Sequence, residues 1–211
     1  MSAAFIPTAD ALAVFTAGWL MLLGPAGRML PRPAHAGTRL AVAAVAAGLL
    51  FVPINGLHVW NWIFSYYPNP SLPILGLLIA QRSPRFLGVT FFHSADWWAT
   101  WIFGAVVGSL VYLQPLIFGR GFDFHYWGWH TDYAALTLTA VAVGFLACGN
   151  RFGVLLLAAL AAFTFGALES SNCWDYVVDP VYWLASVVVL VRRGVIEGLA
   201  RRQAKLSQTT A

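Results

Sequence analysis

Long apolar segments recur along this chain of 211 residues, and each is long enough, or nearly so, to cross a lipid bilayer. Only 9% of the residues are charged, whereas a soluble domain usually carries roughly 25%. We therefore expect an all-α, polytopic transmembrane bundle. The clearest segments are 10–27, 39–63, 96–118, 133–149, 152–169 and 179–193.

A seventh apolar segment, 71–81, would rise only about 16 Å as an α-helix, or half of a bilayer. It could cross as a short third span or re-enter from the side on which it began. Arginine clusters follow both the first and the last segment, and the positive-inside rule places both in the cytoplasm. Clusters on one side require an even number of crossings between them. The prediction is therefore seven crossings, with the amino terminus outside and the carboxyl terminus in the cytoplasm.

This topology also sorts the remaining charges. Of the 12 basic residues, only Arg120 falls outside, together with most of the 8 acids. No basic stretch precedes the first apolar segment, so we expect that segment to remain as a helix. The chain shows neither repeats nor a linker, which predicts one integral membrane domain over 1–211.

The net charge of +4 does not indicate a nucleic-acid partner, because the basic residues occur singly or in pairs beside apolar segments. Membrane lipids are the expected neighbours. Alanine-rich helices and a preference for arginine over lysine favour a GC-rich bacterial source, and with it the inner membrane as the location.

Four aspartates lie where helices are predicted to begin. Asp179 precedes Pro180, which is typical of an N-cap followed by proline at the first helical position. Asp10, Asp96 and Asp132 lie at the starts of other spans. A carboxylate there accepts hydrogen bonds from free backbone N–H groups and faces the positive end of the helix dipole. We expect a structural role for these four acids.

A polar face is predicted near the outer end of the second span. Asn55, His58 and Trp62 follow i, i+3, i+7 spacing, with Asn61 beside them. Polar side chains in a membrane are costly unless they face protein or water, so this face should point into the bundle. It could bind a substrate, or it could form interhelical hydrogen bonds that need no ligand.

The outer loop GFDFHYWGWHTDY has the densest chemistry in the chain. It places Asp123, His125 and His130 among aromatic residues that include Trp127 and Trp129. Histidine and carboxylate together suit zinc or copper, but the spacing of the two histidines matches no metal signature, and no metal is predicted. We assign these residues to substrate binding. The alternative is an aromatic belt in the headgroup region.

Glu169 ends the sixth span and opens the loop ESSNCWDYVVDP, which contains Trp174 and Asp175. An acid at the carboxyl end of a helix opposes the dipole, so capping does not explain Glu169. A carboxyl group in an aromatic-walled site can hold a proton near neutral pH and donate it. We predict Glu169, Asp175 and His58 as catalytic residues and Trp174 as part of the substrate site. The alternative is a solvated glutamate at headgroup level.

Residue placement excludes two classes of membrane protein. A retinal protein needs a lysine within the membrane, whereas the only lysine, Lys205, lies in the tail. A bis-histidine haem needs two histidines at one depth, whereas His58 and His93 are predicted near opposite faces. A secondary transporter would be favoured by paired broken helices, and only one short helix is predicted. The sequence leaves any other cofactor unknown.

Two functions remain. The first is an enzyme that acts on a lipid or isoprenoid from the outer leaflet by acid/base chemistry, with aromatic walls that suit apolar or cationic intermediates. The segment NGLHVWNWIFSYYP and the helix number resemble the small seven-helix membrane terpene cyclases, although Asn61 stands where an acid would be wanted. The alternative is a non-catalytic subunit of a larger respiratory, photosynthetic or biosynthetic complex. Segments such as AVAAVAAGLL would let helices of a membrane-protein partner approach closely.

Overall fold

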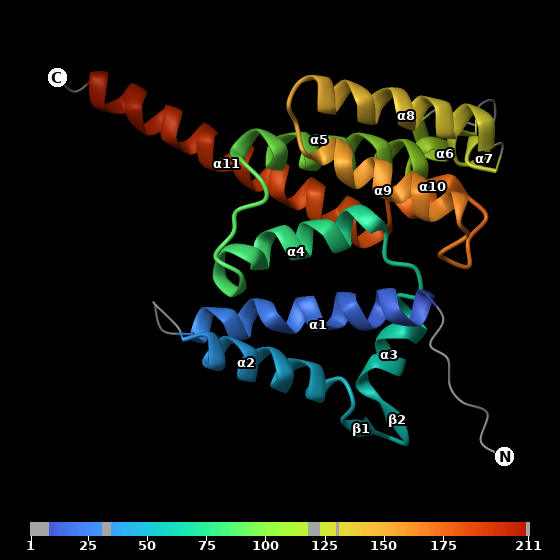
Figure 1. Ribbon diagram of the computed structural model, residues 1–211. Coiled ribbons are helices and arrows are strands. Elements are labelled where there is room, and N and C mark those ends of the chain that lie inside the picture. Colours follow the sequence, from blue (N-terminus) through green and yellow to red (C-terminus); the bar gives the residue numbers. More distant parts are fainter. Residues whose placement is uncertain (1–8, 31–34, 118–122, 130, 210–211) are drawn as a thin grey trace, which may run out of the picture.

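The chain folds into long helices that lie side by side, with successive ones alternating in direction (Figure 1). The structure is a computed structural model that describes residues 9–30, 35–117, 123–129 and 131–209. Apart from one small hairpin, the regular structure of these residues is helical, which confirms the all-α class. The long helices are α1 (Ala9–Met29), α2 (Ala36–Leu49), α4 (Leu72–Phe86), α5 (Ser94–Tyr112), α8 (Thr131–Ala147), α9 (Phe152–Thr164) and α11 (Pro180–Thr209).

Short elements gather at one end of the bundle, where α1 also begins (Figure 1). The turns that join α4 to α5 and α8 to α9 lie at the other end, towards which the basic part of α11 extends. The short elements are β1 (Pro53–Ile54), β2 (Leu57–His58), α3 (Val59–Tyr66), α6 (Gln114–Ile117), α7 (Phe124–Trp127) and α10 (Cys173–Val177).

Aspartates begin the helices much as predicted. Asp179 Oδ1 accepts hydrogen bonds from the backbone N–H groups of Val181 and Tyr182, at 2.8 and 2.9 Å. In the first turn of α5, Asp96 Oδ2 accepts from His93 N at 2.8 Å as part of a capping box. Each carboxylate satisfies backbone donors that a helix start leaves without a partner, which confirms the structural role of both acids.

Among the described residues, one helix, α1, is long and apolar enough to cross a membrane by length and composition, with a mean hydropathy of 1.4. Helices α2 and α9 and most of α8 are apolar but shorter. A straight crossing needs about 20 residues, and α2 and α9 have 14 and 13. By these measures the described chain is a helical protein with one candidate membrane span.

The second predicted span, 39–63, does not form one helix. Helix α2 stops at Leu49, the hairpin of β1 and β2 follows, and α3 begins at Val59. The cause is the pair Asn55 and Gly56, whose φ angles of 51° and 81° are left-handed. A two-residue type I′ hairpin turn needs this conformation at both positions, and Asn-Gly is a preferred sequence for it. The helix face predicted for the polar residues of this segment is therefore wrong.

Two helices are longer than predicted. The short segment expected at 71–81 forms α4, whose 15 residues rise about 22 Å. The last segment, expected at 179–193, continues to Thr209 as α11, and its end projects beyond the neighbouring helices (Figure 1). Both extensions carry arginines, which apolar segments alone do not reveal.

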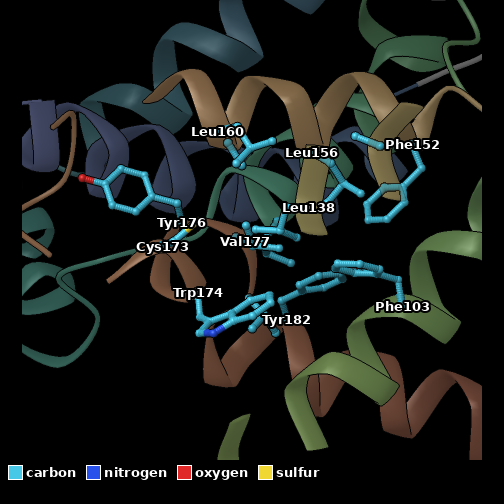
Figure 2. Packing of buried hydrophobic residues seen from close by; sticks show 14 of the residues in the cluster. Phe103, Leu138, Phe152, Leu156, Leu160, Cys173, Trp174, Tyr176, Val177 and Tyr182 are labelled. Carbon is cyan, nitrogen blue, oxygen red and sulfur yellow. The ribbon is translucent and has the colours of Figure 1, made fainter. Parts of the chain in front are cut away.

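The main hydrophobic core joins α4, α5, α8, α9, α10 and α11, and Figure 2 shows part of it. Tyr182 is fully buried there, and its hydroxyl donates to the Thr100 carbonyl at 2.7 Å. Gly104 makes room for this ring, because a Cβ at that position would lie 2.7 Å from Tyr182 Cζ. Trp174, predicted as part of the substrate site, is only 2% exposed and belongs to the core.

Candidate functional site

The short helices α7 and α10 dock on each other through the buried side chain of Asn172. Its Oδ1 accepts from Trp174 N at 2.9 Å and thereby caps α10. Its Nδ2 donates to the His125 carbonyl at 3.0 Å, and Cys173 N donates to the Gly128 carbonyl at 3.1 Å. One amide side chain therefore fixes the start of α10 and the position of α7 together.

Close packing completes this junction. The Trp174 indole N–H donates to the Phe124 carbonyl at 3.0 Å, and the two rings stack with their centroids 4.5 Å apart. A Cβ at Gly128 would lie only 1.7 Å from Asn172 Oδ1. Only glycine fits this position without displacing α7 from α10.

His125 and Asp175 face each other across the junction. His125 Nε2 lies 3.8 Å from Asp175 Oδ1, and the two side chains are 41% and 34% exposed. The second carboxylate oxygen accepts from the Ser170 hydroxyl at 2.5 Å, and Ser170 Oγ in turn accepts from Asn172 N at 3.0 Å. Asn172 Nδ2 also lies 3.1 and 3.3 Å from the two ring nitrogens of His125. The carboxylate is oriented on one side and open to the imidazole on the other.

A half-exposed imidazole beside an oriented carboxylate is equipped for proton transfer. Histidine is the most frequent general acid or base, and a neighbouring carboxylate can hold its ring in place. The exposed ring of Trp129 stands edge-on to the imidazole, with 6.4 Å between the ring centroids. This ring offers an apolar surface next to His125 and Asp175. The roles predicted for His125, Trp129 and Asp175 stay predictions.

Three other residues are predicted to bind substrate from the loop that contains His125. Asp123 caps α7, since its Oδ1 accepts from Tyr126 N at 2.9 Å. Trp127 is partly exposed, with its ring 6.1 Å from that of Phe124. His130 lies outside the described residues. Substrate contacts by these three predicted residues stay predictions.

Glu169 does not have the surroundings expected of a proton donor. Its side chain is exposed, and its backbone N–H donates to Asp10 Oδ1 at 3.0 Å. The aromatic-walled setting predicted for Glu169 is therefore wrong. Asp10 is buried and ties the start of α1 to this loop, in keeping with its predicted structural role.

A separate group of polar residues lies at the hairpin and the start of α3. His58 Nδ1 lies 2.7 Å from the Phe51 carbonyl, and the Trp62 indole donates to the Ile54 carbonyl at 3.0 Å. These contacts hold the hairpin on α3. In Figure 1, this unit packs beside α1, whereas α7 and α10 lie beyond α4. The predicted members of this group are Asn55, His58, Asn61 and Trp62. The structure does not bring them next to His125 and Asp175.

Asp179 forms a second buried junction, of which the sequence predicted only the N-cap. Its Oδ2 accepts from both the backbone N–H and the hydroxyl of Ser71, at 3.0 and 2.5 Å, which joins the start of α4 to α11. Burial raises the pKa of nearby Tyr67 well above its ordinary value, and the negative charge of Asp179 raises it further. Tyr67 therefore keeps its proton, and the Asp179 carboxylate caps α11. Both features indicate that this junction has a structural role.

No known protein family, curated protein or solved structure matches the chain. Within the described residues, no group of three or more His, Cys, Asp or Glu side chains could hold a metal ion. The resemblance to membrane terpene cyclases thus gains no support from relatives.

Proposed function

We propose that the chain is a multi-pass protein of a bacterial inner membrane, with seven crossings, the amino terminus outside and the carboxyl terminus in the cytoplasm. The alternating direction of α1, α2, α4, α5, α8, α9 and α11 supports this topology (Figure 1). Arginines accompany helix ends at one end of the bundle, as the positive-inside rule requires of the cytoplasmic side. They include Arg28, Arg85 and Arg151, and Arg192 begins the basic part of α11.

Apolar outward faces give further support. Leu136 and Val143 on α8 are 68% and 53% exposed, and Val188 on α11 is 62% exposed. Water would disfavour so much exposed hydrocarbon, whereas lipid chains or a partner helix would cover it. The shortness of α2 and α9 is compatible with crossing, because a bilayer thins locally around a short span at modest cost.

At the outer end, we infer acid/base catalysis on a lipid or isoprenoid substrate. The observation that carries this proposal is the half-exposed pair of His125 and Asp175, whose imidazole and carboxylate lie 3.8 Å apart beside an aromatic wall. His125 exchanges a proton with the substrate, and Asp175 stabilises the imidazolium and holds the ring in place. Trp129 supports the apolar part of the substrate.

The test compares membrane lipids of cells that express the chain with those of cells that do not. Mass spectrometry of lipid extracts should show one depleted and one accumulated species, and His125→Ala and Asp175→Asn should abolish the difference. His35→Ala is the matched control, because His35 is exposed and its side chain caps no helix. If wild-type expression changes no lipid, or if both variants retain the change at equal protein level, the catalytic proposal is wrong.

A non-catalytic membrane subunit is the second candidate, and the outward face of α2 favours it. Cβ atoms at Gly37 and Gly48 would meet nothing within 4 Å, and Ala41 and Ala44 are exposed. Such a narrow face suits close approach of another transmembrane helix. Under this hypothesis Gly48→Leu would lower the protein level in its native membrane but not in a host that lacks the partner. The catalytic hypothesis predicts no difference between the hosts.

A further inference from the structure

A continuous apolar groove runs along the surface between α4 and α9. It consists of two hollows, of about 420 and 300 Å³, that share the lining residues Gly76, Ile79 and Leu155. The larger one also touches α1 and reaches Leu168, next to the loop that begins α10. The smaller one extends in the opposite direction along α4 and α9. The groove therefore follows the helices over much of their length.

The smaller hollow ends at a cation. Arg151, just before α9, lines it together with Phe91 and Phe92. The guanidinium is exposed and is held in position by one donor, Nη1, which bonds to the Phe91 carbonyl at 2.6 Å. None of the carboxylates in the described part of the chain pairs with it. A guanidinium carries five N–H donors in a planar fork that matches phosphate, so Arg151 retains donors for an anion.

We propose that this groove binds one anionic phospholipid, with an acyl chain between α4 and α9 and the phosphate on Arg151. An apolar channel with a single cation at one end is complementary to a molecule with a long tail and one anionic head. Basic pockets between helices on the cytoplasmic side are known to bind such heads. The inference rests on the proposed membrane topology, which places Arg151 at the cytoplasmic headgroup level.

The backbone supports the position of this headgroup site. The backbone N–H of Arg151 donates to Asp96 Oδ1 at 2.8 Å, and the side-chain amide of Asn150 donates to the Ala95 carbonyl at 3.3 Å. The turn before α9 is thus tied to the first turn of α5. The backbone at Arg151 is therefore fixed in place. Binding a phosphate would require the ordering of little more than the Arg151 side chain.

Native mass spectrometry tests the proposal on the full chain, purified in mild detergent and depleted of lipid. Phosphatidylglycerol, phosphatidylcholine and inorganic phosphate are added separately. The wild-type protein should retain one phosphatidylglycerol in preference to phosphatidylcholine. Arg151→Gln should weaken phosphatidylglycerol binding about ten-fold, as expected for loss of a charge-assisted contact. Arg28→Gln should bind as the wild type does, because Arg28 is exposed at the same end but does not line the groove.

Val154→Trp gives an independent variant that keeps the charge. Val154 lines the smaller hollow and is 55% exposed, so an indole there should fill the groove without entering the core. Binding of both lipids should fall. Equal binding by wild type and Arg151→Gln, unchanged binding by Val154→Trp, or a bound phosphate without lipid preference would each overturn the proposal. Because detergent-solubilised protein has no orientation, this experiment is independent of the topology, which cysteine labelling tests separately.

Discussion

A histidine–aspartate pair lies at each end of the bundle. His93 Nδ1 lies 3.6 Å from Asp96 Oδ2 at the end where α5 begins, and His125 lies 3.8 Å from Asp175 at the end formed by α7 and α10. Asp96 is buried, and each of its oxygens accepts a backbone N–H, from His93 and from Arg151. Asp175 is one-third exposed, and its Oδ1 faces His125.

The two pairs therefore have similar distances between imidazole and carboxylate but differ in the chemistry that they can perform. Both oxygens of Asp96 are engaged by backbone donors, so this carboxylate holds two helix starts together. The Asp175 carboxylate is oriented by the Ser170 hydroxyl through one oxygen only. What distinguishes a candidate catalytic pair from a structural one is thus the hydrogen-bonding capacity that remains on the carboxylate, together with exposure to a substrate.

Asp96→Ala should have the largest effect on stability. It would leave the N–H groups of His93 and Arg151 without their acceptor, at a cost of about 3 kcal/mol in the free energy of unfolding. Asp175→Ala should cost less than about 1 kcal/mol, because its pair is partly exposed. Reversible unfolding in mixed detergent micelles measures both values. Equal losses for the two variants would remove the distinction drawn between the pairs.

Gly128→Ala should come next, and it should affect only the pair of His125 and Asp175. The new methyl group would collide with Asn172 and push α7 away from α10, lowering the free energy of unfolding by about 2 kcal/mol. The lipid change attributed to His125 and Asp175 should weaken, although neither residue has been altered. Gly144→Ala is the control, since a Cβ there meets nothing within 4 Å and should leave both measurements almost unchanged. Full lipid conversion by Gly128→Ala would show that the docking of α7 does not matter.

His93→Gln should have a smaller effect. His93 takes part in the capping box of α5, and its side chain is 67% exposed, so the loss should stay below about 1 kcal/mol. Lipid conversion should persist in this variant and disappear in His125→Gln. Unfolding and lipid extracts measured on the two variants together provide the comparison. If His93→Gln lost the lipid conversion, the chemistry would depend on the end of the bundle that contains His93 and Asp96. The assignment to His125 and Asp175 would then be wrong.

Local patterns in the sequence predicted most of the helical fold. Apolar runs located the long helices, and the caps at Asp96 and Asp179 were recognisable because cap and helix are adjacent in the chain. The hairpin was missed because hydrophobicity alone continued the second helix through Asn55 and Gly56. Their Asn-Gly sequence, read as a type I′ turn, would have revealed it.

The candidate site was predicted only in part. His125 and Asp175 were identified in their separate loops, but no local pattern specifies that α7 docks on α10. Asn172 controls this docking, and the preference of asparagine for N-caps was the one sequence signal for it. The surroundings of Glu169 differ from the prediction because its position in the chain says nothing about the exposure of its side chain. Packing between residues far apart in the sequence determines both the docking of α7 on α10 and the exposure of Glu169.

The two cysteines can assign each pair to a side of the membrane without changing stability. Cys148 is exposed near the turn that precedes Arg151, whereas Cys173 is buried in α10, the helix that contains Asp175. Burial raises the pKa of the Cys173 thiol to about 11, so the reactive thiolate is scarce at neutral pH. A membrane-impermeant maleimide added to intact cells should therefore label neither residue. After permeabilisation it should label Cys148 alone.

Ser171→Cys provides the positive control, since Ser171 is exposed next to Asn172 in the loop before α10. This variant should be labelled in intact cells, which would place His125 and Asp175 outside and His93 and Asp96 inside. Labelling of Cys148 from outside would reverse the proposed topology and move the catalytic pair to the cytoplasmic face. The geometry of the pair would be unchanged, but its substrate would then have to come from the inner leaflet.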